Sequence, residues 1–437
     1  MNDNTTDAVP GHDDPGLPAR LAALDLMRAA MARRGGLDEA LNLPGFRKLK
    51  PQERAFARAL CMAILRNHGR IERALDARLE KRPQPAVIDL LRLGLAQIYA
   101  MDVPDFAAVA TTVKLAERDN ATRPFKGLIN AVLRGLIREP IKGTPPEANV
   151  PDWLFQRWKA NYGEALARAV AAVVTDEPPT DLTPRDPAQA DALATALEAE
   201  VLPGPVLRTR RKGDLAGWTG FEDGTWWVQD AAAAVPARLL NARPGETALD
   251  MCAAPGGKTL QLAATGAGVV AVDRSASRLK RVTENLVRTQ LSAEVIAADA
   301  EAWDDPRTFD AVLLDAPCTS TGTFRRNPDV LWATRPGDIG KLADVQHRLL
   351  DAAAARVKPG GRLVYCVCSL EREEGETQAI AFLKRHPDFT TAAVGAGEAG
   401  APEGAVTPEG WLRILPCQLA DKGGLDGFFA ARFVRAG

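Results

Sequence analysis

Apolar residues in the first third of the chain recur at helical spacing. Between residues 18 and 139 they lie three or four positions apart, as at Leu21, Leu24 and Met27. This spacing places side chains on one face of a helix. Glycine and proline separate the successive runs. We therefore predict an α-helical bundle of five to seven helices and no strand over residues 18–140, after a polar, acidic and disordered tail at residues 1–17.

The pattern becomes irregular after this bundle. Residues 140–151 contain several prolines and a glycine, which predict a linker. A helical run follows from Trp153, and residues 180–230 mix alternating and irregular pieces. The alanine-rich run from Ala231 to Leu240 predicts another helix. We assign residues 141–245 to a linker and a connecting RNA-binding subdomain.

From about Glu246 the chain alternates between short apolar runs, turns and helical segments. Such alternation predicts a doubly wound parallel sheet, over residues 246–437. The expected strands are Thr247–Met251, Val269–Val272, Glu294–Ala297, Phe309–Leu314 and Arg362–Val367. The expected helices are Thr259–Ala264, Ser275–Leu291, Asp344–Val357 and Glu374–Arg385.

Acidic residues close four of the expected strands. They are Asp250, Asp273, Asp299 and Asp315. Ligands of open α/β sheets bind at the carboxyl ends of the strands, where a carboxylate can accept hydrogen bonds from ribose hydroxyls or an adenine amino group. One such aspartate is commonly a loop cap. Four at matching positions favour a nucleoside ligand, with Asp273 on the ribose and Asp299 on the base.

A glycine turn follows the first of these strands, at residues 252–258. It is not a phosphate loop, because Cys252 stands where that motif needs glycine, and the dinucleotide motif G-x-G-x-x-G is absent. The turn lets the backbone approach a ligand closely. Without a phosphate-binding loop, S-adenosylmethionine fits better than a nucleoside triphosphate.

Two of the expected strands end beside a cysteine. Cys318 follows Asp315, and Cys368 ends the run that begins at Tyr365 and includes Cys366. Two thiols are therefore expected at one rim of the sheet. Buried cysteines are inert by default, and these three lack the spacing and the fourth ligand of a zinc site. We expect no metal, and we interpret Cys366 as a packing residue.

Composition limits the class of protein. The 437 residues are 46% hydrophobic and 25% charged, with a net charge of -1, so no overall basic charge indicates nucleic acid. Six cysteines and no apolar run of the ~20 residues that span a bilayer predict a cytoplasmic protein with reduced thiols. We also expect a monomer. Two local groups of cations are candidates for RNA contact, and the alternative is that they are ordinary solvated surface residues. One group is Arg208, Arg210, Arg211 and Lys212, and the other is Lys48, Lys50, Arg54, Arg58 and Arg66.

Four motifs resemble the NOL1/NOP2/Sun family of RNA cytosine-5 methyltransferases. They are Asp-x-Cys-Ala-Ala-Pro-Gly-Gly-Lys from Asp250, Asp-Ala-Pro-Cys-Thr-Ser-Thr-Gly from Asp315, Tyr-Cys-Val-Cys-Ser-Leu from Tyr365 and Asp-Gly-Phe-Phe-Ala from Asp426. Phrases such as Asn-Ala-Val-Leu-Arg from Asn130 resemble the helical RNA-binding domain of NusB. Together they resemble the bacterial member of the family that acts on small-subunit ribosomal RNA.

This resemblance implies a Rossmann-like methyltransferase domain that binds S-adenosylmethionine, an RNA substrate, and catalytic roles for Cys368 as nucleophile, Cys318 as second cysteine and Asp315 beside the base. The implied cofactor-binding residues are Cys252, Ala253, Ala254, Pro255, Gly256, Gly257, Lys258, Asp273, Asp299 and Asp315. Relatives often read Glu-Glu-Asn-Glu where this chain has Glu373-Glu374-Gly375-Glu376. The expected product is 5-methylcytidine in small-subunit ribosomal RNA. Methylation of transfer RNA and a catalytically silent assembly factor remain as alternatives.

Overall fold

The computed structural model describes residues 16–32 and 36–437, which form two compact units divided between Pro151 and Asp152. Most of the expected tail, residues 1–15, lies outside the described residues. The end of that prediction is wrong, because Leu17 already begins the first helix. Each unit is described by itself.

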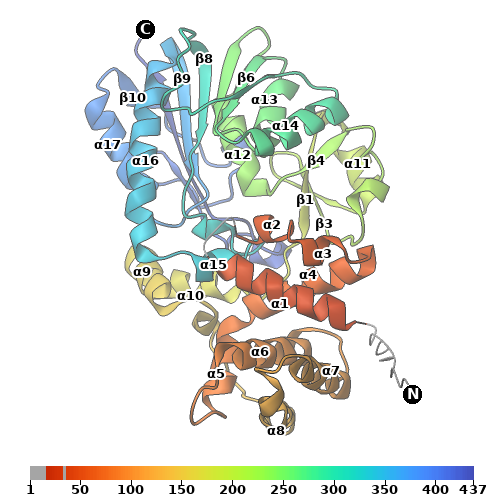
Figure 1. Cartoon of the computed structure of the whole chain (residues 1–437). Coiled ribbons are helices and arrows are strands. Elements are labelled where there is room, and N and C mark those ends of the chain that lie inside the picture. Colours follow the sequence, from red (N-terminus) through yellow and green to blue (C-terminus); the bar gives the residue numbers. More distant parts are fainter. Residues whose placement is uncertain (1–15, 33–35) are drawn as a thin grey trace, which may run out of the picture. The chain divides into compact units, whose positions relative to one another are not determined.

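The described part of the first unit is all α-helical, as predicted (Figure 1). It has eight α-helices rather than five to seven, because α2 and α3 are only five and four residues long. The helices are α1 (Leu17–Met31), α2 (Gly36–Ala40), α3 (Pro44–Arg47), α4 (Pro51–Arg66), α5 (His68–Asp76), α6 (Pro85–Ala100), α7 (Asp105–Arg118) and α8 (Lys126–Arg138).

Apolar faces at helical spacing form the core of this unit. Helix α8 buries Ile129, Val132, Leu133 and Leu136, which are the positions that its pattern predicted. A Cβ on Gly94 of α6 would lie 2.8 Å from a methyl group of Leu133, so glycine lets α6 and α8 approach closely. The bundle is therefore held by side-chain packing between its helices.

The second unit begins with two helices and a small antiparallel sheet. The helices are α9 (Asp152–Tyr162) and α10 (Glu164–Ala172); the sheet has the order β2-β3-β1-β4, and α11 (Ala190–Leu197) packs on it. Its strands are β1 (Thr180–Pro184), β2 (Glu200–Leu202), β3 (Val206–Thr209) and β4 (Trp226–Val228). Trp226 and Trp227 are buried, so they pack in cores.

The main sheet of this unit has the order β10-β12-β9-β8-β5-β6-β7, with β11 paired to β12 (Figure 1). Its strands are β5 (Thr247–Met251), β6 (Gly268–Asp273), β7 (Glu294–Ala297), β8 (Phe309–Asp315), β9 (Val357–Val367), β10 (Phe389–Thr391), β11 (Leu412–Ile414) and β12 (Phe428–Arg435). The five predicted strands are present, and their neighbours run parallel from β7 to β9. The prediction of an all-parallel sheet is wrong beyond β9, because β12 returns antiparallel to it.

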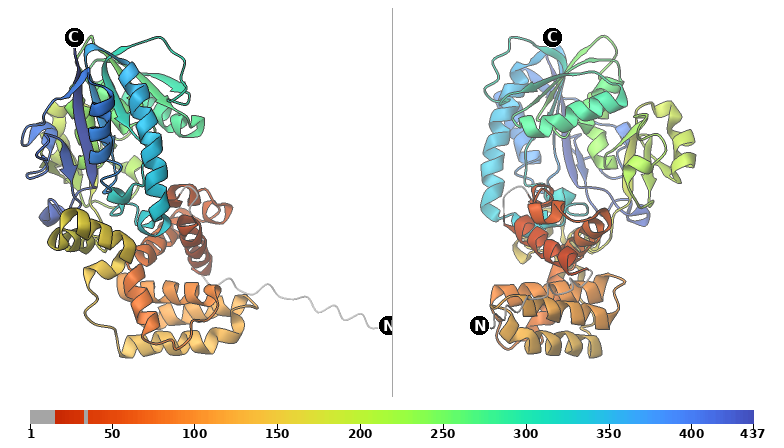
Figure 2. Two further views of the ribbon diagram at one scale, coloured as in Figure 1. Left: turned by 90° about the vertical axis from the view of Figure 1, so that its left-hand side faces the viewer. Right: turned by 45° about the vertical axis from the view of Figure 1, so that its right-hand side comes forward.

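Helices cover both faces of the main sheet (Figure 2). They are α12 (Ala231–Leu240), α13 (Gly257–Ala264) and α14 (Ala276–Thr289) on one face, and α16 (Pro336–Ala355) and α17 (Glu376–Arg385) on the other, with the short α15 (Asp329–Ala333) before α16. Side chains alternate along the strands: Leu313 and Cys366 pack with α12, whereas Leu314 and Tyr365 pack with α16. Both faces of β8 and β9 are buried, which is why these strands read as continuous apolar runs.

Candidate active site

The two thiols expected at the rim of the sheet are in contact. Strands β8 and β9 are parallel neighbours, with Asp315 opposite Cys366, so their carboxyl ends meet. The Sγ atoms of Cys318 and Cys368 are 3.5 Å apart, and neither cysteine is in a disulfide. Both side chains are half-buried. The pair is therefore placed to share a proton and to meet a substrate.

The loop after Cys318 wraps around Cys368. Ser320 adopts a left-handed conformation, and its hydroxyl oxygen lies 3.5 Å from the Cys368 Sγ atom and 3.9 Å from the Cys318 Sγ atom. The N–H of Gly322 donates to the Cys368 carbonyl at 3.0 Å. A Cβ on Gly322 would lie 2.2 Å from the carbonyl oxygen of Gly427, so this loop needs glycine to cross the segment before β12. Nothing in local spacing predicted the roles of Ser320 and Gly427.

Lys258 and Asp315 form an ion pair beside the thiols. The Lys258 Nζ atom lies 2.7 Å from Asp315 Oδ2 and 5.1 Å from the centre of the Phe428 ring. Burial lowers the pKa of Lys258, but Asp315 and the nearby thiols outweigh it and hold that pKa above its usual value. The charge of Lys258 therefore reaches the Cys368 thiol. Cys366 is fully buried, as a packing residue should be, and its thiol also donates to Asp315 Oδ1 at 3.4 Å.

The surroundings of the two thiols favour different protonation states. The hydrogen bond with Cys318 lowers the pKa of Cys368 despite burial, and Ser320 and Lys258 lower it further. The same hydrogen bond raises the pKa of Cys318, as do burial and the charge of Glu374. The surroundings therefore make Cys368 the more acidic thiol of the pair, although the charge of Asp315 acts against this on Cys368.

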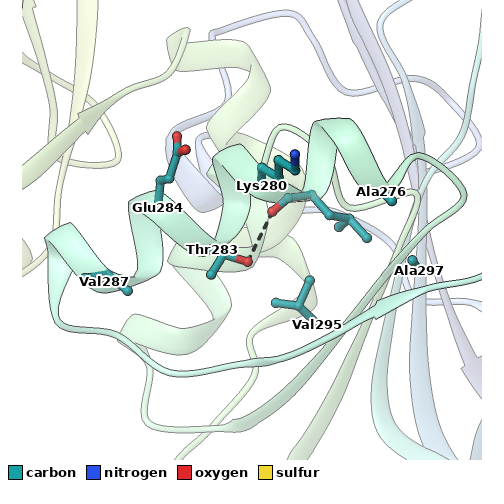
Figure 3. A pocket seen from close by; sticks show the side chains of 8 residues that line it. Ala276, Lys280, Thr283, Glu284, Val287, Val295 and Ala297 are labelled. Atoms are coloured by element: carbon teal, nitrogen blue, oxygen red, sulfur yellow. Dashed lines mark hydrogen bonds between the residues drawn. The ribbon is translucent and has the colours of Figure 1, made fainter.

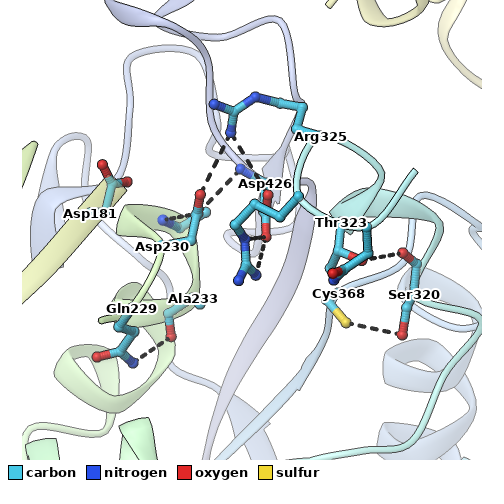
Figure 4. Close-up of polar contacts among 12 residues, drawn as sticks. Asp181, Gln229, Asp230, Ala233, Ser320, Thr323, Arg325, Cys368 and Asp426 are labelled. Atoms are coloured by element: carbon cyan, nitrogen blue, oxygen red, sulfur yellow. Dashed lines mark hydrogen bonds and ion pairs between the residues drawn. The ribbon is translucent and has the colours of Figure 1, made fainter. Parts of the chain in front are cut away.

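A largely buried ionic cluster lies near Cys368 (Figure 4). Arg325, 2% exposed, lies 3.6 Å from Asp230 Oδ2 and 3.7 Å from Asp426 Oδ1. Arg326 donates through Nε to Asp426 Oδ2 at 2.8 Å. Asp230 also accepts the backbone N–H of Asp426 at 3.2 Å and caps α12. Two arginines and two aspartates thus join the loop after β8, the start of α12 and the segment that enters β12.

The glycine turn joins β5 to α13 and bends sharply. Cys252 and Gly256 have φ angles of 63° and 106°. The Asp273 carboxylate, 3% exposed, accepts the N–H groups of Ala254 at 3.1 Å and Ser275 at 2.8 Å, which fixes the turn against the end of β6. Burial raises the pKa of Cys252 to about 12, so this thiol is not a nucleophile.

Asp250 lies beneath the turn and has an unused acceptor. Its Oδ2 atom accepts from Thr259 Oγ1 at 2.6 Å, whereas Oδ1 is buried and has no hydrogen-bond partner. Asp299 is exposed after β7, at the end of the neighbouring strand. An orphaned carboxylate oxygen, a turn with close backbone and acids at successive strand ends offer acceptors for the amino and hydroxyl groups of S-adenosylmethionine. The residues fit this cofactor.

A cavity lies to one side of the two cysteines (Figure 3). It has a volume of about 650 Å³ and is lined by α14 and β7, from Ala276 at the start of α14 and Ala297 at the end of β7 to Val287, which is 75% exposed. Neither cysteine lines it. The cavity is an apolar groove along the edge strand that begins near Asp273 and Asp299.

The two groups of basic residues are only partly exposed. Arg208 is buried and donates to both oxygens of Asp181 at 2.7 Å. The suggestion that Arg208 contacts RNA is therefore wrong. Lys212 pairs with Glu177, and Arg211 lies over the Trp218 ring. Arg66 is also buried and cannot belong to an exposed basic face, whereas Lys48, Lys50, Arg54 and Arg58 are exposed.

Two other features, a membrane-spanning helix and a metal-binding group of side chains, are absent from the described part of the chain. No helix there is long and apolar enough to cross a membrane. No group of three or more histidine, cysteine, aspartate or glutamate side chains there could hold a metal ion.

Comparison with known proteins matches both halves of the chain. Residues 237–434 match the family model "16S rRNA methyltransferase RsmB/F", and residues 17–138 match the NusB family. Ribosomal RNA small subunit methyltransferase B of Vibrio cholerae is 35% identical over 88% of this chain and 90% of its own. The enzyme of that name from Pseudomonas putida is 36% identical over 95% of this chain and 98% of its own.

A solved structure shows the same fold over almost the full length. The crystal structure of PH0851 superposes with a TM-score of 0.75 at 24% identity, covering 97% of this chain and 99% of that one. With the sequence matches over both units, this confirms the helical NusB-type front and the Rossmann-like sheet. The chain therefore belongs to the RsmB/F family of S-adenosylmethionine-dependent methyltransferases that act on ribosomal RNA.

Proposed function

We propose that this enzyme methylates C5 of a cytosine in 16S ribosomal RNA through a covalent bond between Cys368 and C6 of the base. The observation that carries this proposal is the pair of unlinked thiols, 3.5 Å apart, next to the Lys258–Asp315 ion pair. A single thiol would serve for covalent attack. A second thiol in contact with it suits a reaction that must also remove a proton before the first can leave.

The chemistry requires a nucleophile because C5 of cytosine is itself a poor one. The Cys368 thiolate adds to C6, and the electron pair of the C5–C6 bond then attacks an electrophilic methyl group. S-adenosylmethionine, when bound, supplies that methyl group. Asp315 lies beside Cys366 and Lys258, where it is placed to bind N3 and N4 of the base as charge develops.

The last step regenerates the enzyme. The proton on C5 must leave so that its electron pair can restore the C5–C6 bond and expel the Cys368 thiolate. Cys318 is the base in this proposal, directly or through a relay, because its sulfur touches that of Cys368. It begins the cycle as a thiol, so it first releases its own proton to solvent after Cys368 has bonded to C6. The proton taken from C5 thus ends on Cys318 or its relay, and the thiolate returns to Cys368.

The cofactor site of this proposal is the turn at residues 252–258 with three strand-end acids. Asp273 would bind the ribose hydroxyls, Asp299 the adenine amino group, and Asp315 would border both cofactor and base. The helical residues 18–140 and the connecting residues 141–245 are proposed to extend the RNA-binding surface, in a cytoplasmic enzyme.

Product analysis tests this function directly. Ribosomal RNA from a deletion strain is incubated with purified enzyme and labelled S-adenosylmethionine, digested to nucleosides, and mapped in parallel by bisulfite sequencing. Label in 5-methylcytidine at one position of 16S RNA is the expected result. Label confined to uridine, or found on transfer RNA alone, would replace the proposal, and no labelled RNA of any kind would favour a silent assembly factor.

A further inference from the structure

A buried carboxylate joins the two loops that carry the thiols. Glu374 follows β9 and is 0% exposed. Its Oε1 atom accepts the N–H of Thr319 at 2.9 Å and Gln346 Nε2 at 3.1 Å. Its Oε2 atom accepts the hydroxyls of Thr319 and Ser369, both at 2.5 Å. All four groups donate to Glu374 and favour its charged form, although burial outweighs them and leaves the pKa of this carboxyl above its usual value.

The partners of Glu374 are the immediate neighbours of the thiols. Thr319 follows Cys318, Ser369 follows Cys368, and their hydroxyl oxygens are themselves 3.1 Å apart. Backbone hydrogen bonds link the two loops on either side of this point, from the N–H of Ala316 and of Gly322. Between those two bonds, the Glu374 carboxylate connects the loops at the level of the sulfur atoms.

The charge of Glu374 also distinguishes one thiol from the other. Among the groups around Cys318, Glu374 adds to the effects of Cys368 and burial and raises the pKa of the Cys318 thiol. Lys258 acts in the opposite sense on Cys368, and Arg326 also lies within electrostatic range of that thiol. A negative charge behind Cys318 and positive charges near Cys368 both favour a proton on Cys318, whereas the Asp315 carboxylate acts against them on Cys368.

We propose that Glu374 is a positioning residue for the thiol pair: its carboxylate holds Cys318 and Cys368 in contact and keeps their shared proton on Cys318, which leaves Cys368 as the nucleophile. This inference rests on the proposed function for its meaning in catalysis. The inference also says which of the two thiols is ionised, and this can be measured without RNA or cofactor.

Thiol labelling of the full-length Glu374→Gln enzyme tests the inference. Glutamine keeps the shape of the side chain but removes its charge and turns an amide donor toward groups that donate. Each protein is treated briefly with limiting iodoacetamide, and labelling of the peptides that contain Cys318 and Cys368 is compared by mass spectrometry. We expect the ratio of Cys368 to Cys318 labelling to fall about tenfold, the change that one pKa unit produces.

Steady-state kinetics provides the second readout. Glu374 does not border the expected RNA or cofactor surface, so KM for both should stay near that of the wild type. We expect kcat to fall on the order of 10²-fold, as when reacting groups are misplaced by about 1 Å. A protein that has merely lost stability would show normal kcat per folded molecule.

Glu371→Gln is the matched control, because Glu371 is an equally buried acid in the same loop. Its carboxylate binds Arg157 at 2.7 Å and Trp158 at 3.3 Å, and neither of these residues follows a cysteine. This variant should melt earlier but keep the wild-type labelling ratio. If Glu374→Gln does not fold, Ser369→Ala, which removes one of the four hydrogen bonds, should shift the ratio in the same direction.

The inference is overturned if the labelling ratio is unchanged in both Glu374→Gln and Ser369→Ala, or if Glu371→Gln changes it equally. A shifted ratio in an enzyme whose product is not 5-methylcytidine would support the role of Glu374 and reject the proposed function. The two proposals therefore fail separately.

Discussion

At the scale of single residues, the proposed mechanism depends on which of two touching sulfur atoms attacks the base and which serves its release. The environments of Cys318 and Cys368 differ in the charges around them rather than in their exposure, since both are half-buried. Their roles are separable by substitution, because attack needs one thiol and release needs the other.

Cys368→Ala should abolish turnover and form no covalent complex with RNA, because no thiolate remains to attack C6. Cys318→Ala should still attack and methylate but fail to release the product, so an RNA adduct should accumulate when S-adenosylmethionine is present. Denaturing gels with labelled RNA measure the adduct, and the double variant is the control. An adduct from Cys368→Ala but not from Cys318→Ala would reverse the two roles.

Asp273→Ala should weaken binding of S-adenosylmethionine by about 1–3 kcal/mol, the typical effect of removing a charged hydrogen-bond partner. Calorimetry measures the change. Because Asp273 also accepts two backbone N–H groups, Asp273→Asn, which keeps one carbonyl oxygen, separates loss of the turn from loss of the ribose contact. Equal affinity in wild type and Asp273→Ala would place the ribose elsewhere.

Asp250 predicts a pH dependence of stability. Burial raises the pKa of its carboxyl from 3.8 to about 7, against the hydrogen bond from Thr259. The folded protein therefore binds more protons than the unfolded chain between these values, and the contribution of this group to the free energy of unfolding should fall as pH rises through the window. Urea unfolding of wild type and Asp250→Asn across the window measures it. The difference in stability between them should shift in favour of the variant with rising pH, and a difference independent of pH would show that the pKa is not raised.

At the scale of secondary structure, the parallel strands were predictable and the antiparallel ones were not. Strands β8 and β9 are buried on both faces over residues 311–314 and 363–367, so these residues form apolar runs that local pattern detects. Strands β2, β10 and β11 are only three residues long, too short for any period to appear. The motif at Phe428 was visible in the sequence, but its pairing with β9 depends on a partner far away in the chain.

The residues of the site were likewise predictable in part. The thiols, the turn and the acids stand at strand ends, where topology alone brings them together. Ser320, Gly427, Arg326 and Glu374 enter through loops whose paths sequence periodicity does not determine. Arg208 was misread because exposed and buried arginines look alike in a sequence, and only the register of β1 and β3 places Asp181 opposite it.

Gly322→Ala should destabilise the enzyme by roughly 1–3 kcal/mol, since its Cβ would press into the Gly427 carbonyl and part the loop from the segment before β12. It should lower kcat as well, because that loop carries the hydrogen bond to Cys368. Gly340→Ala is the control: its Cβ would meet nothing within 4 Å in α16, so stability should rise by roughly 0.5–1 kcal/mol. Thermal melting measures both changes. Equal melting temperatures for the wild type and Gly322→Ala would contradict the close approach of this loop to Gly427.

At the scale of the whole molecule, the residues of the site come from the second unit alone, which suggests that chemistry and RNA selection are divided between units. A chain that begins at Asp152 should bind S-adenosylmethionine as the full-length enzyme does, because the turn and all four acids remain. It should lose affinity for ribosomal RNA or choice of target, measured by filter binding and by mapping of methylated positions. Unchanged affinity and selectivity would assign the helical unit a purely structural role.

The pairing of β12 with β9 has a consequence for biosynthesis. A ribosome makes β9 first, and its antiparallel partner emerges only after residues 368–427 have been translated. During that interval an apolar strand presents unpaired backbone groups, which is the kind of edge that aggregates or recruits chaperones. Asp426, which accepts from Arg326, and Gly427, which lies against Gly322, arrive with the same segment. The surroundings of the thiols therefore stay incomplete until residue 427 has been translated, long after both thiols have been made.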